Sequence, residues 1–212
     1  MRTITTVIFD FDGTLAYSLP EVKKIFLEIA REFNYPATPQ LINRLIHRET
    51  KEVLKNLKLP LWKLPKVEKL FRRKMKTAIK NIKPFLETEK MIVDLKKEEL
   101  RLGIFTSNAK ENVKYFLQKH QLGKYFDFID GGSSFFGKAR KLKKLLRKEK
   151  LKKEEVVYVG DETRDIQAGQ KNQVKVIAVT WGINPRPVMA KYHPDYLVDN
   201  QQELVSILKK LC

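Results

Sequence analysis

Residues 6–15 read TVIFDFDGTL, an apolar run that ends in two aspartates and a glycine. Residues 6–10 are rich in β-branched and aromatic side chains, which is typical of a buried strand. Alternation along an extended chain points the carboxylates of Asp10 and Asp12 to the same side, and Gly13 then permits a sharp turn. An Asp-Gly turn after a strand is also common in proteins where it has no chemical role. The stretch therefore predicts a strand with two acids at its end.

Four further apolar runs predict four more strands, at residues 102–106, 126–129, 156–160 and 174–180. Helical patterns lie between most of these runs, as where Leu142, Leu145 and Leu146 form an apolar stripe. This order of strand, helix and strand predicts a parallel sheet covered on both faces. The expected fold class is α/β, a doubly wound parallel sheet with a small helical cap domain.

An interval of about 90 residues separates the first strand from the second, which is too long for one crossover helix. Residues 20–33, 41–57 and 67–82 have helical patterns, while Pro60 and Pro65 are expected to break the chain between the last two. The sequence thus predicts a core of residues 1–17 and 84–212 and a helical cap of residues 18–83.

Polar side chains follow the later strands, and open parallel sheets bind ligands at the carboxyl ends of their strands. The candidates after the second, third and fourth strands are Thr106, Ser107 and Asn108, then Lys138, then Asp161 and Asp165. Hydroxyl and N–H groups bind phosphate oxygens, an ammonium neutralises them, and carboxylates suit Mg²⁺. Each candidate alone also has a purely structural explanation, such as a helix cap or a helix N-terminal acid.

Taken in chain order, residues 10–15, 106–108, 138 and 160–165 resemble motifs one to four of the haloacid dehalogenase superfamily. The resemblance implies a phosphatase with Asp10 as nucleophile and Asp12 as acid/base. It implies a Mg²⁺ site formed by Asp10, the backbone carbonyl of Asp12, Asp161 and Asp165. It also implies a phosphate site formed by Thr106 and Lys138, with Ser107 and Asn108 beside them. The position of the insert is similar to the C1-type caps of phosphoglycolate phosphatase-like relatives, which close over the substrate. The resemblance therefore implies that the connections near 16–19 and 82–85 act as hinges. The second aspartate of the Asp-x-Asp pair argues against dehalogenation.

Two other functions fit the same residues. A phosphomutase of this fold, similar to β-phosphoglucomutase, differs only in whether water or a sugar hydroxyl intercepts the phosphoenzyme. A polyanion-binding or nucleic-acid-binding protein would instead use the net charge of +18. Residues 138–155 alone contain ten basic and three acidic side chains, although a solvated helix face explains such a run most simply.

Composition also limits the setting in which the protein works. No run approaches the roughly 18 apolar residues of a membrane helix, and the one cysteine, Cys212, allows no internal disulfide. We expect a cytoplasmic protein, a monomer or weak dimer without a membrane partner. Its expected partner is a small phosphorylated metabolite, and its expected cofactor is Mg²⁺.

Overall fold

The computed structural model describes residues 4–45, 47, 61–132 and 137–212. Its main sheet has six parallel strands in the order β5-β4-β1-β6-β7-β8. Their bounds are β1 Thr6–Phe9, β4 Arg101–Phe105, β5 Phe128–Asp130, β6 Val156–Gly160, β7 Lys175–Val179 and β8 Tyr196–Val198. The predicted α/β class is therefore confirmed. The five predicted strands correspond to β1, β4, β5, β6 and β7.

The strand β8 was not predicted, because it lacks the pattern that reveals the others. It has three residues and pairs on one side only, with β7. Its first two residues are half-buried, so no continuous apolar run marks it. A short, partly exposed edge strand is a common way to end a sheet.

Strand β1 lies in the middle of the sheet, and the chain runs outward from it in both directions. The connection after β1 leads to β4 and β5 on one side, while the later strands β6, β7 and β8 continue on the other. This reversal next to β1 is the topological switch point at which open α/β sheets bind ligands. The two aspartates that follow β1 therefore occupy the place where a site is expected.

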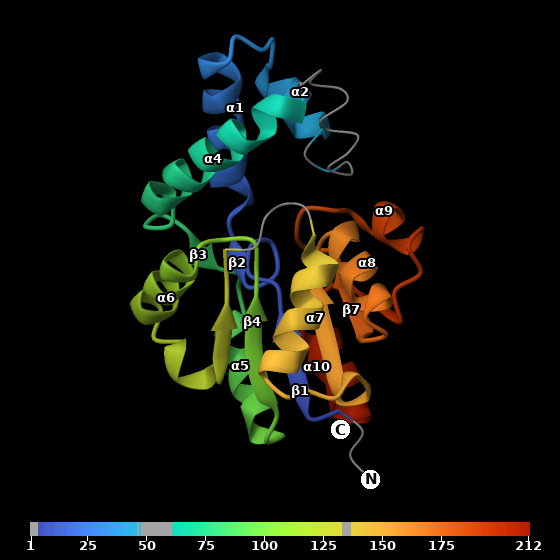
Figure 1. Cartoon of the computed structure of the whole chain (residues 1–212). Coiled ribbons are helices and arrows are strands. Elements are labelled where there is room, and N and C mark those ends of the chain that lie inside the picture. The colour runs from blue at the N-terminus through green and yellow to red at the C-terminus, as the bar shows by residue number, and fades with distance from the viewer. Residues whose placement is uncertain (1–3, 46, 48–60, 133–136) are drawn as a thin grey trace.

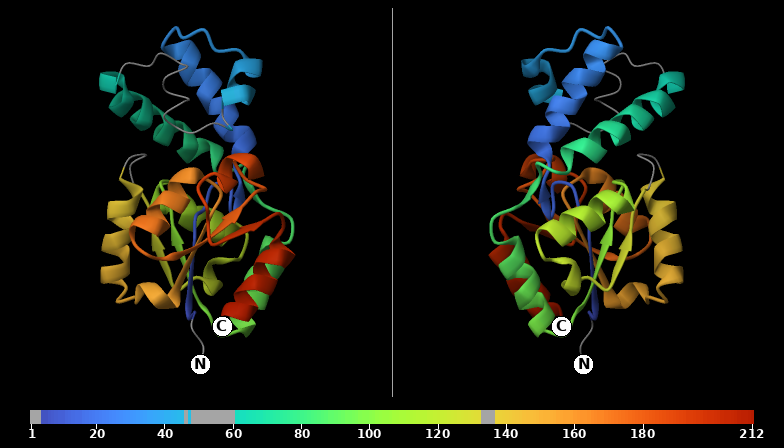
Figure 2. Two further views of the ribbon diagram at one scale, coloured as in Figure 1. Left: turned by 90° about the vertical axis from the view of Figure 1, so that its right-hand side faces the viewer. Right: turned by 90° about the vertical axis from the view of Figure 1, so that its left-hand side faces the viewer.

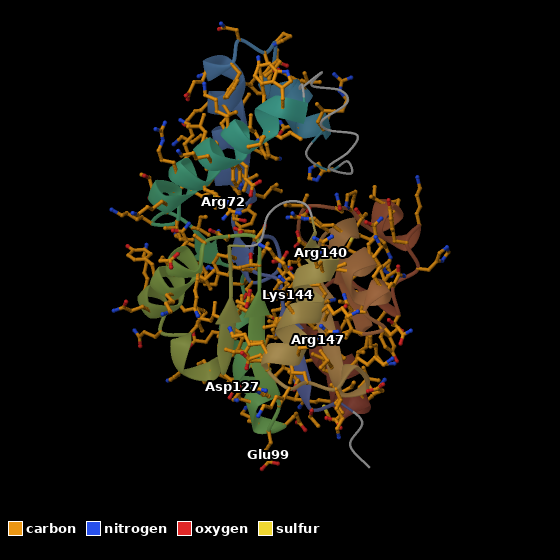
Figure 3. The ribbon with its side chains drawn as sticks, in the orientation of Figure 1. Arg72, Glu99, Asp127, Arg140, Lys144 and Arg147 are labelled. Atoms are coloured by element: carbon orange, nitrogen blue, oxygen red, sulfur yellow. The ribbon has the colours of Figure 1, made fainter. Side chains whose placement is uncertain are left out.

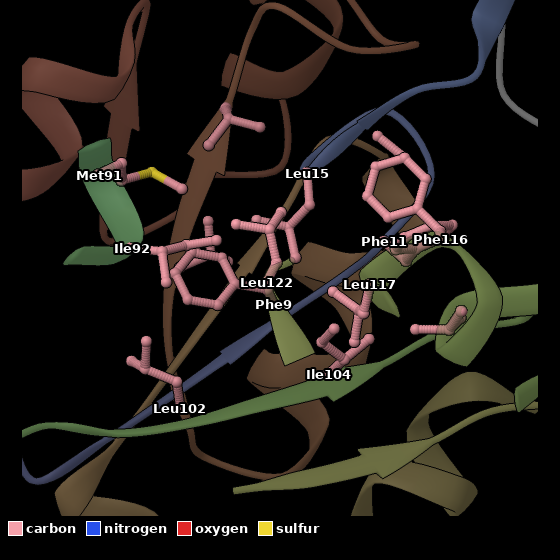
Figure 4. Packing of buried hydrophobic residues seen from close by; sticks show 14 of the residues in the cluster. Phe9, Phe11, Leu15, Met91, Ile92, Leu102, Ile104, Phe116, Leu117 and Leu122 are labelled. Atoms are coloured by element: carbon pink, nitrogen blue, oxygen red, sulfur yellow. The ribbon is translucent and has the colours of Figure 1, made fainter. Parts of the chain in front are cut away.

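Helices cover both faces of the sheet (Figure 2). The helices α5 Thr88–Lys97, α6 Lys110–Lys119 and α10 Gln201–Leu211 pack on the face that carries Val7 and Phe9, whose apolar cluster is shown in Figure 4. The opposite face, which carries Ile8, is covered by α7 Lys138–Lys148 and α8 Thr163–Lys171. Short elements complete this layer structure, namely η2 Gly123–Tyr125, η3 Lys153–Glu155 and α9 Arg186–Ala190.

A group of helices between β1 and β4 lies beyond the carboxyl ends of the strands (Figure 1). They are α1 Leu19–Glu32, α2 Pro39–Leu45, η1 Leu61–Lys63 and α4 Leu64–Ala78. The rings of Phe26 and Phe71 lie 5.4 Å apart between α1 and α4. The expected helices at 20–33 and 67–82 correspond to α1 and α4. Of the expected helix at 41–57, residues 41–45 belong to α2, His47 lies in a turn, and residues 46 and 48–57 lie outside the described residues.

The helix α4 begins earlier than predicted, because Pro65 lies in its first turn and does not break the chain. A first-turn proline loses no helical hydrogen bond, so this position tolerates it. The two connections between the helices and the core, β2 Ala16–Tyr17 and β3 Lys83–Pro84, pair antiparallel with each other. The domain boundaries at 17/18 and 83/84 stay a prediction. Among the described helices, none is both long and apolar enough to cross a bilayer.

Candidate active site

The loop after β1 contains Asp10 and Asp12, the two aspartates of the sequence at residues 6–15. The N–H of Asp10 donates to the Val159 carbonyl at 2.8 Å, which extends the pairing of β1 with β6. Asp10 Oδ1 accepts from the N–H of Phe11 at 2.7 Å. At Gly13 the backbone has a φ of +77°, and a Cβ there would clash with the carboxylate of Asp161. Glycine is therefore required for the loop to turn this close to β6.

Asp10 and Lys138 form an ion pair that is closed to solvent. Lys138 Nζ lies 2.7 Å from Asp10 Oδ2, and the two side chains are 3% and 2% exposed. Lys138 also pairs with Asp165. Burial raises the pKa of Asp10 to about 7, because Lys138 opposes only part of the desolvation. Burial disfavours the charged form of Lys138, yet Asp10 and Asp165 outweigh it and raise the lysine's pKa.

Two more carboxylates from the end of β6 complete this cluster. Asp161 accepts from the Thr14 hydroxyl at 2.9 Å and from the N–H of Ile183 at 2.8 Å. Asp165 accepts from the Tyr158 hydroxyl at 3.0 Å and from the N–H of Glu162 at 3.0 Å. Both side chains are fully buried. Their oxygens are thus fixed in place by four donors, from the loop after β1, the end of β6 and the segment after β7.

Asp10, Asp161 and Asp165 each present a carboxylate oxygen within 4.8 Å of the others. Burial and the neighbouring acids Glu162, Asp10 and Asp165 raise the pKa of Asp161 well above its usual range. Three buried carboxylates with one lysine among them favour the binding of a further cation. An all-oxygen donor set of this kind fits Mg²⁺. The side chain of Asp12 is not part of this cluster.

Asp12 has a different environment from Asp10. Its Oδ2 accepts from the side-chain amide of Asn108 at 2.9 Å. Its Oδ1 is buried and has no hydrogen-bond partner among the described residues. Burial raises the pKa of Asp12, opposed chiefly by the hydrogen bond from Asn108. A carboxyl group with a raised pKa and an unpartnered oxygen is suited to donate a proton.

The predicted phosphate-binding segment lies at the end of β4, beside Asp12. Thr106 is fully buried, and its hydroxyl accepts from the N–H of Asn108 at 3.1 Å. The Ser107 hydroxyl accepts from Arg164 at 3.4 Å. The side-chain oxygen of Asn108 accepts from Ala109 and Asn112, so its whole amide group is engaged within the protein. The structure brings this segment, Asp10, Asp12 and Lys138 together, while phosphate binding by it stays a prediction.

One cation near the site comes from the helices above the sheet and was missed from the sequence. Arg72 of α4 lines a cavity of about 30 Å³ together with Phe71, Asp12, Ser107 and Asn108, and Figure 3 shows it between α4 and the core. Glu68 accepts from its guanidinium at 2.7 and 3.2 Å. The cavity has room for only a few water molecules. No pattern singled out Arg72, because only the tertiary structure brings α4 to this position.

A second contact joins these helices to the metal-ligand candidates. His47 Nδ1 lies 2.6 Å from the Ile183 carbonyl, and Asn184 donates to the His47 carbonyl at 3.2 Å. The same Ile183 donates its N–H to Asp161. The segment after β7 thus contacts both the helical layer and the carboxylate cluster.

The chain resembles known proteins along almost all of its length. Residues 7–179 match the family described as haloacid dehalogenase-like hydrolase. The chain is 31% identical over 206 residues to a phosphoglycolate phosphatase of Synechococcus elongatus, with 97% of each chain covered. It is 27% identical to the pyrophosphatase PpaX of Bacillus cereus, with 98% of each covered. A structure described as a predicted phosphatase from Clostridium acetobutylicum superposes with a TM-score of 0.86 at 22% identity, covering 99% of this chain and 100% of that one.

These matches include every candidate site residue, from Asp10 directly after β1 to Asp165 in α8. The extent of the family match and the identity over the whole chain lead to one conclusion. The chain belongs to the family of haloacid dehalogenase-like hydrolases.

Proposed function

We propose that this chain is a Mg²⁺-dependent phosphatase that hydrolyses a small phosphate monoester through an aspartyl-phosphate at Asp10. The observation that carries the proposal is the buried pair of Asp10 and Lys138, joined at 2.7 Å within a cluster of three carboxylates. The names of its relatives, a phosphoglycolate phosphatase and a pyrophosphatase, support the hydrolysis of a bond to a phosphoryl group, and the first of them names a monoester.

In the first step a carboxylate oxygen of Asp10 attacks phosphorus, and the bond from phosphorus to the ester oxygen breaks. The leaving oxygen takes the proton of Asp12, whose raised pKa keeps the carboxyl group protonated to a higher pH than usual. Asn108 holds the other oxygen of Asp12 and so orients the donor. The products of this step are the free alcohol and an aspartyl-phosphate.

In the second step Asp12, now ionised, removes a proton from water as the water attacks phosphorus. The bond from phosphorus to Asp10 breaks, which restores the Asp10 carboxylate and releases inorganic phosphate. Lys138 offsets negative charge at Asp10 and on the transferring group through both steps. Thr106 and Ser107, which lie beside Asp12, are proposed to bind the remaining phosphate oxygens.

Asp10, Asp161 and Asp165 would hold the metal, with Asp12 contributing its backbone carbonyl. The bound Mg²⁺ would supply positive charge that keeps Asp10 ionised near neutral pH and offsets charge on the phosphoryl group. Thr14 and Ile183 orient Asp161, while Tyr158 and Glu162 orient Asp165. These donors act on the ligands and not on the substrate.

We further propose that Arg72 binds the leaving group of the substrate. Arg72 lines the cavity directly beside Asp12, which is the proton donor to that group. A guanidinium at this place favours a leaving group that carries its own negative charge. The cavity of about 30 Å³ is too small for such a group, so the helical layer must move to admit it.

Hydrolysis of p-nitrophenyl phosphate tests the proposal, with Mg²⁺ or EDTA and with wild type or Asp10→Asn. We expect turnover that needs Mg²⁺ and that falls by at least about a thousandfold in Asp10→Asn, because the nucleophile is lost. Rapid quenching followed by mass spectrometry should find phosphate on the wild-type chain and none on the variant. Asp94→Asn, the same change at a half-buried position outside the site, is the matched control and should keep full activity. Full activity of Asp10→Asn would refute the assignment of the nucleophile.

A further inference from the structure

A second cationic site lies outside the candidate active site, between α7 and the end of α8. It is a cavity of about 470 Å³ whose cationic lining residues are Lys143, Arg147, Lys150, Lys153 and Lys171. We name it the α7–α8 groove. No carboxylate lines it among the described residues. The basic run at 138–155 supplies four of these cations, while Lys171 comes from a separate helix.

Among the described residues, the cations of the α7–α8 groove have almost no acidic partners. Lys153 approaches Glu154 at 3.9 Å and pairs with the Gln173 side chain. The other four have no carboxylate within 4.0 Å in the part of the chain that the structure describes. The nearby acids are engaged elsewhere, since Glu149 pairs with Arg101 at 2.7 Å and Glu155 with Lys152 at 3.0 Å.

Helix dipoles offset only a small part of this charge. The helices α7 and α8 end at Lys148 and Lys171, and each C-terminus carries about half an elementary negative charge. Two such ends supply about one negative charge against five positive side chains. A bound anion with several charges would relieve the remaining repulsion.

The lining of the groove also indicates which kind of anion fits. Among the described residues, no aromatic side chain lines it, so it offers no aromatic ring on which a nucleobase can stack. Asn172 is held by the carbonyls of Ala139 and Ala168 at 2.9 and 2.8 Å, which ties α8 to α7 and keeps the walls together. A volume of about 470 Å³ is that of a small-molecule site.

We infer that the α7–α8 groove binds a compact polyphosphate, a molecule of two or more linked phosphoryl groups, through its five cations. The site is separate from the proposed catalytic centre. Arg147 is nine residues beyond Lys138 in the same helix, or about 14 Å along its axis, and Figure 3 shows Arg140, Lys144 and Arg147 following one another down α7. The inference therefore holds or fails independently of the proposed function.

Calorimetric titration of the whole chain with sodium tripolyphosphate in EDTA tests this inference. The test variant is Arg147→Gln/Lys171→Gln, which removes two cations of the groove. The matched control is Arg140→Gln/Lys144→Gln, which removes one arginine and one lysine from exposed positions of α7 outside the groove. Unfolding midpoints establish that both variants fold. Because binding is measured directly, the test does not depend on enzyme activity.

We expect the test variant to bind tripolyphosphate about tenfold more weakly than wild type, because two charge-assisted contacts are lost. The control should change binding by less than about threefold. ATP should bind about as tightly as tripolyphosphate, because no aromatic ring lines the described part of the groove to hold the base. Equal losses in both variants would overturn the inference, since they would indicate diffuse attraction to the net charge. Binding of duplex DNA without binding of tripolyphosphate would also overturn it, in favour of a nucleic-acid surface.

Discussion

Asp10 and Asp12 are two residues apart, yet their surroundings differ. Asp10 lies against Lys138 and two other carboxylates, whereas Asp12 has one amide donor and one unpartnered oxygen. The difference suits the two residues to different roles in the proposed reaction. The nucleophile Asp10 must be ionised, whereas the proton donor Asp12 must be protonated. Burial raises the pKa of Asp10 to about 7, so Lys138 alone does not keep this side chain fully ionised at neutral pH.

This pKa predicts how stability changes with pH when no metal is bound. Between about pH 4 and pH 7 the unfolded chain has released the Asp10 proton while the folded chain retains it. The unfolded state then binds fewer protons, so the free energy of unfolding falls as pH rises, by up to about 1.4 kcal/mol per pH unit. Asp10→Asn lacks this proton. In EDTA, the stability of wild type relative to Asp10→Asn should therefore decline from pH 5 to pH 7 and level off above.

Urea unfolding at several pH values measures this difference. Asp94→Asn is the control. A hydrogen bond from Lys97 lowers the pKa of Asp94, so the stability of wild type relative to Asp94→Asn should not decline from pH 5 to pH 7. A difference between wild type and Asp10→Asn that is constant with pH, or that grows, would contradict the assigned pKa.

At the scale of single residues, the sequence could indicate the ligands and the nucleophile, since they follow apolar runs at regular places. It could not indicate Thr14 or Tyr158 as their partners. Thr14 donates to Asp161 across 147 positions of the chain, so only the folded loop reveals the contact. Tyr158 lies within the apolar run of β6 and has no feature there that marks it as a donor to Asp165.

Among the elements, α7 begins after a residue with an unusual backbone conformation. Gly137 precedes the helix with a φ of +88° and places Lys138 in its first turn. This is the left-handed region, which costs side chains other than glycine about 1–2 kcal/mol. Apart from its chain neighbours, no atom of the described residues lies within 4 Å of a Cβ built at this position, so the cost of a substitution is conformational and not steric.

Gly137→Ala should therefore lower the free energy of unfolding by about 1 kcal/mol, as measured in urea. Gly123→Ala is a matched control, because Gly123 begins η2 without a positive φ and a Cβ there meets only ordinary contacts. It should leave stability within about 0.5 kcal/mol of wild type. Equal effects of the two changes would show that the backbone of Gly137 is not strained for alanine.

Elements within long apolar runs were predictable. The shortest elements were not, except the three-residue edge strand β5, which overlaps the apolar run at 126–129. The buried strands β1, β4, β6 and β7 correspond to uninterrupted runs of apolar residues. The edge strand β8 and the paired connections β2 and β3 have two or three residues each, which is too few for a periodic signal. The start of α4 was misjudged because a proline looks the same in a helix's first turn and in a break.

The arrangement of the whole molecule brings α4 over the ends of the strands and Arg72 beside Asp12. If Arg72 binds a charged leaving group, Arg72→Gln should raise KM about tenfold for a substrate such as phosphoglycolate. The value for p-nitrophenyl phosphate, whose leaving group offers no carboxylate or phosphate to Arg72, should change much less. Steady-state kinetics of both substrates measure the ratio.

Arg73→Gln is the control for this prediction, because Arg73 is exposed on the same helix. It should affect neither substrate. An equal rise in KM for both substrates in Arg72→Gln would show that Arg72 supports the helical layer or the phosphoryl group, and does not distinguish leaving groups.

The sequence by itself determined the parallel sheet, the helical insertion and the catalytic candidates, because apolar periodicity and the polar residues that end each run are local signals. Only the tertiary structure decided which groups meet. It joined Asp10 to Lys138 from 128 positions away, set Arg72 beside Asp12, and gathered Lys171 with the cations of α7. The physical reason is that such contacts depend on how strands order themselves and how helices pack on them, and the free energy of that packing is a property of the whole chain.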